Sequence, residues 1–321
     1  MAKDYTYAVA RIRARELNLL SGQDLDSLLT CNSYNDALLL LGDKGWNTEN
    51  ISSYDQLLNA ENEKLWQFMS ELVNDYSVFD VFLKPNDFHN LKASIKAVIT
   101  DGDVKNIFYD QGTVSAIKIF EAIKNREYNK LPDHLQRCAG EAITALLQTS
   151  DGQLCDIIID KASLEELYSI GLHSDSAIIK LYAETTVAAT NIKSAIRCNK
   201  TNKNIDFIKR CLARCDTLNV DTLAAAATKG IDEIYDYLLY TDYKGAVDAL
   251  KVSATAFEIW CDNMLIGKMQ SQKWEPFTEG PLIAYVLARD FEIKAVRMIL
   301  SGKINNLDNK IVKERLRDMY V

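Results

Sequence analysis

Residues 184–200 read ETTVAATNIKSAIRCNK, and their central part decides how the chain is organised. We call residues 191–197 a kernel. In it, Asn191 is followed by an aliphatic residue and a cation, and a second aliphatic residue comes about one helical turn further on. The same order of residue types begins at Asn90 and, with alanine in the first place, at Ala295; a fainter form begins at Ala10. Because the spacing is helical, each kernel predicts a helix that holds a cation beside an apolar stripe.

The three full kernels lie about 100 residues apart, which indicates an internal repeat. This period matches the usual size of a domain and is too long for a solenoid repeat. A capped helix, a turn and a tyrosine-containing helix also recur in residues 22–41, 112–131 and 219–250. We therefore predict three similar helical domains over residues 1–111, 112–217 and 218–321.

The composition favours an all-α fold. Hydrophobic residues make up 48% of the 321 residues, and there are only 4 prolines and 13 glycines. So few helix breakers leave room for long helices, and no stretch shows the sustained alternation of a strand. Long helices are predicted from Ser52 or Ser53 to about Asp75, from Pro85 to about Thr100, from Ala177 to about Cys198 and over 282–300.

Charge and cysteine content bear on the environment of the chain. The net charge of -8 would repel nucleic acid, so we expect no nucleic-acid partner. The seven cysteines are odd in number and lack the spacing of a disulfide framework, which favours free thiols in a reducing cytosol. There is no apolar leader after Met1 and no run of about 18 apolar residues, so we expect a cytoplasmic protein without direct membrane insertion.

No pattern of catalytic residues is found. The phosphate-binding GxxxxGK[ST] loop, GxGxxG and GxSxG are all missing, and none of the histidines His89, His134 and His173 has a second histidine at helical spacing. Cys211 and Cys215 would share a helix face, but no further ligand completes a metal site. We therefore predict no catalytic residue, no metal and no cofactor, and a thiol- or metal-dependent enzyme is the disfavoured alternative.

The candidates for partner binding are the cations of the kernels and an exposed tryptophan. Lys92, Lys193 and Arg297 occupy the same place in the three kernels, and Arg11 lies in the fainter one. They either cover apolar surface with their aliphatic stems or present positive charge to an acidic or carbonyl-rich partner. Trp46, Trp260 and Trp274 are candidate interface anchors, because large aromatic residues in or near loops are frequent hot spots, and core packing is the default expectation for Trp260. Trp274 is the best exposed candidate, because the segment 271–281 around it is the most loop-like of the chain.

Five segments, in order, resemble one family. The last residues, GPLIAYVLARDFEIKAVRMILSGKINNLDNKIVKERLRDMYV at 280–321, resemble the C-terminal end of the C subunit of bacterial and archaeal V/A-type rotary ATPases, the counterpart of the eukaryotic vacuolar ATPase d subunit. Four further segments agree: YAVARIRARELNLLS at 7–21, DFHNLKASIKAVI at 87–99, NIKSAIR at 191–197 and VDTLAAAATKG at 220–230. The resemblance covers essentially the whole chain. Ala295 departs from it, because asparagine is the residue expected there.

The resemblance implies an all-helical, funnel-shaped protein whose three similar domains surround a pseudo-threefold axis. Such a protein sits on the cytoplasmic mouth of the membrane proteolipid rotor ring and receives the rotor shaft subunits of the ATP-hydrolysing head. It has no active site and transmits torque between ATP hydrolysis and ion transport. Whether the ions are protons or sodium, and whether the motor is a pump or a synthase, does not follow from this part of the motor. A free-standing helical-repeat scaffold is the alternative interpretation.

Overall fold

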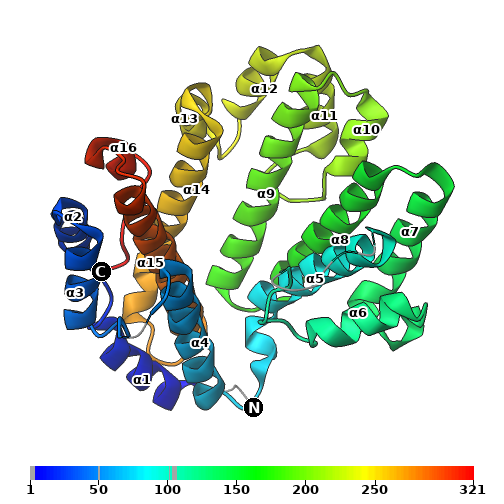
Figure 1. The fold of residues 1–321 in the computed structure, drawn as a ribbon. Coiled ribbons are helices and arrows are strands. Elements are labelled where there is room, and N and C mark those ends of the chain that lie inside the picture. Colours follow the sequence, from blue (N-terminus) through cyan, green and yellow to red (C-terminus); the bar gives the residue numbers. More distant parts are fainter. Residues whose placement is uncertain (1–3, 50, 101, 103–106) are drawn as a thin grey trace. The chain divides into compact units, whose positions relative to one another are not determined.

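The computed structural model describes residues 4–49, 51–100, 102 and 107–321 (Figure 1). In these ranges every regular element is a helix, and there is no strand. The predicted all-α class is therefore confirmed.

The first half of the chain forms α1 Thr6–Glu16, α2 Gly22–Thr30, α3 Tyr34–Asp43, α4 Tyr54–Leu72, α5 Asp80–Thr100, α6 Ala116–Lys124, α7 Asp133–Thr149 and α8 Gly152–His173. The second half forms α9 Ala177–Lys200, α10 Ile205–Cys211, α11 Val220–Lys229, α12 Ile231–Leu238, α13 Val247–Val252, α14 Ala254–Met269, α15 Gly280–Ile304 and α16 Asn309–Lys313. Short 3-10 helices are η1 Tyr76–Phe79, η2 Tyr128–Lys130, η3 Lys244–Ala246 and η4 Gln270–Trp274.

The chain separates into two compact units. Unit 1 joins the two ends of the chain, residues 1–76 and 248–321, with the short segment 176–178. Unit 2 comprises residues 77–175 and 179–247. The division into domains 1–111, 112–217 and 218–321 stays a prediction from the sequence repeat.

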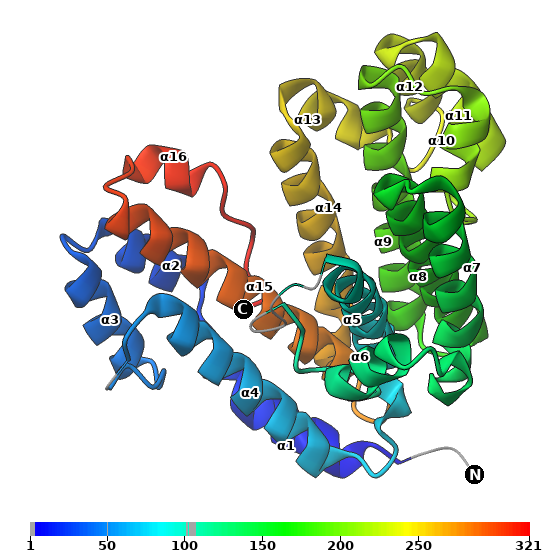
Figure 2. The same ribbon diagram turned by 45° about the vertical axis from the view of Figure 1, so that its right-hand side comes forward.

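Unit 1 is built around α15. This helix packs against α1, α2, α3, α4 and α16, and Figure 2 shows it running beside α4. The third kernel of the chain lies in α15, and its core-facing side is apolar. Its residues Ala295, Val296 and Ile299 are buried in one cluster with Leu57 and Leu58 of α4. Burial of an aliphatic side chain stabilises the fold by about 1.5–3 kcal/mol, so the helical spacing of the kernel fixes which face turns inward.

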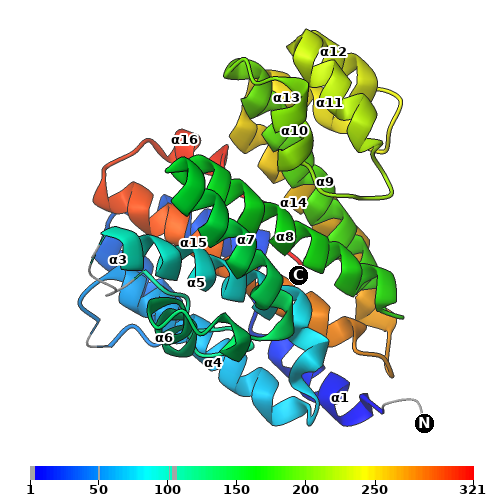
Figure 3. The same cartoon turned by 90° about the vertical axis from the view of Figure 1, so that its right-hand side faces the viewer.

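Unit 2 is built around α5, which packs against α6, α7 and α8 (Figure 3). The first kernel supplies buried Leu91 and Ile95, which belong to one apolar cluster with Ile119 of α6, Leu135 of α7 and Cys155 of α8. Further along the chain, α10 packs against both α8 and α11. The long amphipathic helices thus bury their stripes against sequence neighbours within the unit.

The start of α5 differs from the sequence prediction. The helix begins at Asp80, so the prediction that Pro85 opens it is wrong. A proline inside a helix removes the hydrogen bond that its own nitrogen would give to the carbonyl four residues earlier, and its ring crowds that carbonyl. Buried Val81 and Leu83, on the preceding turn, anchor the helix in spite of this loss. Other starts follow local sequence: Ser21 and Asp24 form a capping box at α2.

Candidate functional site

The asparagines that open the first two kernels are fully buried, and each makes the same pair of hydrogen bonds to the backbone of another residue. Asn191 donates from Nδ2 to the carbonyl of Ala213 over 2.7 Å and accepts from the Ala213 nitrogen at Oδ1 over 3.0 Å. Asn90 makes the same two bonds to Tyr109, at 3.0 and 2.8 Å. Each side chain therefore satisfies both backbone groups of one residue in the irregular segment that follows its helix.

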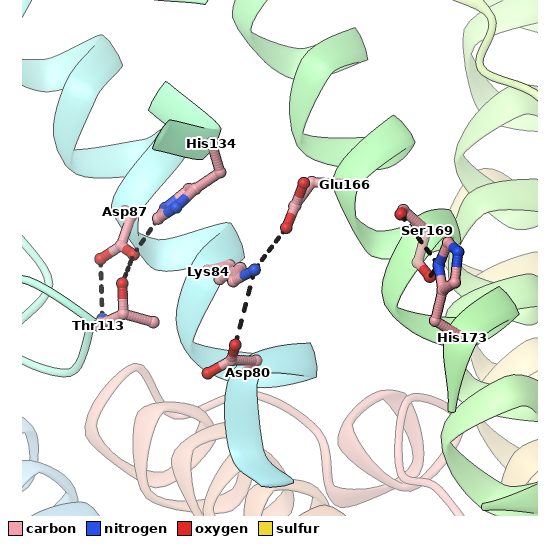
Figure 4. A network of polar contacts seen from close by, with 8 residues as sticks. All are labelled: Asp80, Lys84, Asp87, Thr113, His134, Glu166, Ser169 and His173. Atoms are coloured by element: carbon pink, nitrogen blue, oxygen red, sulfur yellow. Dashed lines mark hydrogen bonds and ion pairs between the residues drawn. The ribbon is translucent and has the colours of Figure 1, made fainter. Parts of the chain in front are cut away.

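Acidic residues on the same helices hold the same segments. Fully buried Asp87 accepts from the Thr113 nitrogen over 3.0 Å, from the Thr113 hydroxyl and from His134 Nε2 over 3.1 Å (Figure 4). Glu184 of α9 accepts from the nitrogen and the hydroxyl of Thr217, over 2.8 and 2.6 Å. These bonds pin backbone that would otherwise be free to move.

The histidine and threonine at Asp87 are not arranged as a nucleophile and its base. Figure 4 shows the carboxylate between Thr113 and His134, so the hydroxyl proton points to the acid and not to the imidazole. Nearby, Lys84 lies between Glu166 at 2.5 Å and Asp80 at 3.6 Å. Burial raises the pKa of Asp80. These hydrogen bonds and ion pairs connect α5 to α7 and α8, so we interpret the network as structural.

The kernel cations of unit 2 are Lys92 and Lys193, and Lys92 forms an ion pair with an acidic neighbour. Lys92 bonds Asp160 of α8 at 2.5 Å, and Lys96, one turn later, bonds Asp156 at 2.8 Å. Lys193 is half-buried on α9. The two kernel lysines thus belong to the same compact unit, on different helices.

Two further candidate cations lie in unit 1. Arg297 bonds Asp55 of α4 at 2.5 Å, with both side chains about half exposed. Arg11 bonds the Tyr7 hydroxyl at 2.9 Å and Glu71 at 3.3 Å, and its guanidinium lies 5.2 Å from the centre of the Phe68 ring. The bonds to Tyr7 and Glu71 raise the pKa of Arg11, the bond to Tyr7 most of all. Each cation is held by its own unit with its charged end at the surface.

Trp274 is the most exposed of the candidates. It ends η4, 86% of its side chain is exposed, and Phe277 follows at 65% exposed. The loop that carries them is fixed from α1, because Arg13 donates to the carbonyls of Gln272 at 2.6 Å and Glu275 at 3.2 Å. Two aromatic side chains are thus presented to solvent on a braced loop. By contrast Trp46 is buried, so the suggestion that it anchors an interface is wrong.

A cavity of about 670 Å³ in unit 1 was not predicted from the sequence. On its wall Arg289 lies between Glu61 and Glu292, at 2.9 Å from each, and 5.2 Å from the centre of the Trp46 ring. Burial raises the pKa of Glu292. The sequence held a signal for this cluster: Arg289 precedes Ala295 by the same number of residues as Lys84 precedes Asn90.

The cysteines do not form the pair considered above. Cys211 is the last residue of α10 and Cys215 lies beyond it, so the prediction that they share a helix face is wrong. Cys215 instead receives a bond from Asn191 at 3.5 Å. Among the described residues, no three histidine, cysteine or acidic side chains are grouped as metal ligands. Within the same ranges, no helix combines the length and the apolar character needed to cross a bilayer.

Comparison with known proteins assigns the chain to a family. The model of the ATP synthase (C/AC39) subunit family matches residues 8–315. The chain belongs to this family. The resemblance to the C subunit of V/A-type rotary ATPases is therefore confirmed.

Proteins named as C subunits of V-type and A-type ATPases align along almost the entire chain. The C subunit of the V-type sodium ATPase of Enterococcus hirae is 24% identical, and the alignment covers 96% of this chain and 97% of that protein. The C subunit of the A-type ATP synthase of Methanocaldococcus jannaschii is 22% identical over 97% of this chain and 86% of its own length. That of Halorubrum lacusprofundi is 23% identical, with 97% and 96% covered.

Proposed function

We propose that this chain is a non-catalytic central-stalk subunit of a V/A-type rotary ATPase. It couples the rotor shaft of the ATP-hydrolysing head to the membrane proteolipid ring, on the cytoplasmic face, during proton or sodium transport. The observation that carries the proposal is the family match over residues 8–315, with relatives named as C subunits aligned along nearly the whole chain. In the proposed complex the chain forms a funnel of three similar domains around a pseudo-threefold axis.

The internal contacts suit a part that transmits torque. Such a part has to deform little under load, and close-packed helices have low compressibility. Irregular backbone is the soft component of a helical protein, and here buried Asn90, Asn191 and Asp87 tie it to the long helices. The mechanical demand of the proposed role is thus met by side-chain to backbone bonds at the kernels.

The Trp274 loop is the proposed main contact with another part of the motor. A large aromatic side chain on a fixed loop loses little conformational freedom when it is covered, so most of its buried area contributes to affinity. Trp274 and Phe277 meet this description because Arg13 already holds their loop. We place this loop against the proteolipid ring or the shaft, the two partners in the proposal.

The kernel cations are proposed as secondary contacts. Lys92, Lys193, Arg297 and Arg11 present positive charge that a partner carboxylate or carbonyl can share. The ion pairs of Lys92 and Arg297 lie at the surface, and pairs of this kind are worth only about 0–1 kcal/mol. Breaking such an ion pair, so that the cation can bind an acidic group of a partner, therefore costs little free energy.

The experiment is recovery of partners from native membranes by the tagged full-length chain, read by native gel and mass spectrometry. The proposal expects the proteolipid ring and shaft subunits to be recovered. Trp274→Ala should lower the recovery of one of them at least tenfold, whereas Leu39→Ala, at another exposed apolar position, should not. A wild-type chain that recovers no motor subunit from membranes containing an intact motor contradicts the proposed function.

The cations are tested by a triple variant. Alanine at Lys92, Lys193 and Arg297 together should weaken assembly and raise its sensitivity to salt. The matched control replaces exposed Lys118, Lys229 and Lys310, which removes the same charge away from the kernels. If the two triple variants assemble equally well and couple ATP hydrolysis to ion transport equally well, the kernel cations are not part of the interface.

A further inference from the structure

Two cysteines of unit 2 have their sulfur atoms in contact. Cys198 lies in the last turn of α9, and Cys211 is the last residue of α10. Their Sγ atoms are 3.9 Å apart. A disulfide has its sulfurs about 2.05 Å apart, so these two have to approach by roughly 2 Å for the bond to form.

The backbone that carries the two thiols is fixed. At the end of α9 the Lys203 nitrogen donates to the Cys198 carbonyl and the Asn202 nitrogen donates to the Asn199 carbonyl, both over 3.0 Å. With Asn202 at φ 52°, this is the Schellman arrangement that ends a helix firmly. Asn204 then caps α10 through the Phe207 nitrogen. The two sulfurs therefore meet because the turn places them together.

The surroundings favour a reactive thiolate. The bond to Cys211 and the charges of Arg197 and Lys203 lower the pKa of Cys198, in spite of burial. A thiolate beside cations is the form that reacts with peroxides and disulfides. Cys211 is only partly buried, which leaves the pair open to a small oxidant from its side. Cys138 is buried and its pKa is raised to about 12, so it lacks these features.

We infer that Cys198 and Cys211 are an oxidisable pair that closes a reversible disulfide between the ends of α9 and α10. The site takes hydrogen peroxide or a small disulfide as its oxidant. When closed, it adds a covalent tie across the turn that leads into α10, the helix packed between α8 and α11. This inference does not depend on the proposed role in a rotary motor.

Hydrogen peroxide oxidises the pair in two steps. The Cys198 thiolate attacks one peroxide oxygen, the O–O bond breaks, and hydroxide leaves. The sulfenic acid formed on Cys198 is then attacked by the Cys211 sulfur; the S–S bond forms, the S–O bond breaks, and a second hydroxide leaves. The protons of the two thiols convert both hydroxides to water, so two electrons pass from the sulfurs to the peroxide.

The test treats the purified full-length chain with a small excess of hydrogen peroxide, blocks remaining thiols, and maps tryptic peptides by mass spectrometry. Trypsin releases Cys198 in the peptide CNK and Cys211 in the peptide CLAR, and cleavage after Arg214 separates Cys215 from both. The expected product is CNK linked to CLAR, lost again after dithiothreitol. Its rate of formation should rise with pH, and at lower pH than for an ordinary thiol, because the pKa of Cys198 is lowered.

Variants distinguish the pair from general oxidation. Cys215→Ser should keep the linked peptides, and Cys198→Ser and Cys211→Ser should lose them. The closed loop is short, and a disulfide across such a loop should raise the melting temperature of the wild-type chain by a few degrees, but not that of Cys198→Ser. A predominant link of Cys211 to Cys215, or free Cys198 and Cys211 after other thiols have reacted, would overturn the inference.

Discussion

Asn191→Ala is the substitution that tests most directly what the kernels do. The wild-type side chain is fully buried and makes two bonds to the backbone of Ala213, which is itself fully buried. Alanine removes both bonds and leaves the nitrogen and the carbonyl of residue 213 without their partner. It also leaves the Cys215 thiol without the bond from the amide.

The size of the loss follows from the two backbone groups. A buried polar group that loses its partner costs about 1–3 kcal/mol, so two such groups cost about 2–6 kcal/mol before relaxation. Water entering the vacated space recovers part of this. We expect a loss of about 3 kcal/mol in the stability of unit 2. Asn199→Ala removes a single bond, to the Ala227 carbonyl, from a half-buried position, and should cost about 1 kcal/mol.

The assay has to report on the correct unit. All four tryptophans, at positions 46, 66, 260 and 274, belong to unit 1, so tryptophan fluorescence does not report directly on Asn191. Urea unfolding followed by circular dichroism and hydrogen exchange at the Ala213 amide are the appropriate measurements. Exchange at that amide should accelerate about 100-fold, the factor that corresponds to about 3 kcal/mol.

The reverse substitution provides the contrast. If asparagine stabilised any kernel, Ala295→Asn would improve the third one. We expect instead a loss of about 2–4 kcal/mol, because residue 295 is fully buried in an apolar cluster where an amide adds volume and lacks partners. An Asn191→Ala variant as stable as wild type, or an Ala295→Asn variant more stable than wild type, would refute the reasoning.

Two further substitutions test the buried charges. Asp87→Ala should destabilise unit 2 by about 3 kcal/mol, read by circular dichroism, because Thr113 and His134 lose their common acceptor; a change below about 1 kcal/mol would show that the network is dispensable. Burial raises the pKa of Glu292, so the folded state holds its proton more tightly than the unfolded chain. The stability of unit 1 should therefore decline as pH rises above 4.5, the ordinary pKa of a glutamate, and Glu292→Gln should flatten that decline in urea unfolding followed by tryptophan fluorescence. An unchanged pH profile in Glu292→Gln would assign the decline to other groups.

The helical spacing of apolar residues is sufficient to predict most of the fold. It identified α4, α5, α9 and α15 because their apolar residues recur on one face and few breakers interrupt them. The errors were local and have local causes. Pro85 lies inside α5 because tertiary burial around it outweighs one missing hydrogen bond, and α10 ends before Cys215 because its segment turns to meet Asn191. Neither effect is visible in a window of sequence.

The residues of the site were less accessible to sequence reasoning. The pattern drew attention to the cations Lys92 and Arg297, whereas the buried partners of the kernels are the asparagines beside them. A repeated polar residue within an apolar stripe signals a buried bond, but its partner comes from a segment about 20 residues away with no pattern of its own. The Arg289 cluster was missed for the same reason, because Glu61 is brought to it from α4.

The third kernel shows how the same requirement is met without asparagine. The segment that follows α15 also has to be held, but Ala295 faces apolar neighbours. Contacts from α14 and η4 replace the amide: Arg317 bonds Asp262 at 2.9 Å, the Asp318 nitrogen bonds Asn263 at 3.0 Å, and Gln270 bonds the Tyr320 carbonyl at 3.1 Å. The last segment of the chain is thus tied to a neighbouring helix, whereas the earlier ones are tied to their own kernel. An apolar residue at position 295 is therefore compatible with a firmly held C-terminal segment, because the bonds from α14 and η4 hold it.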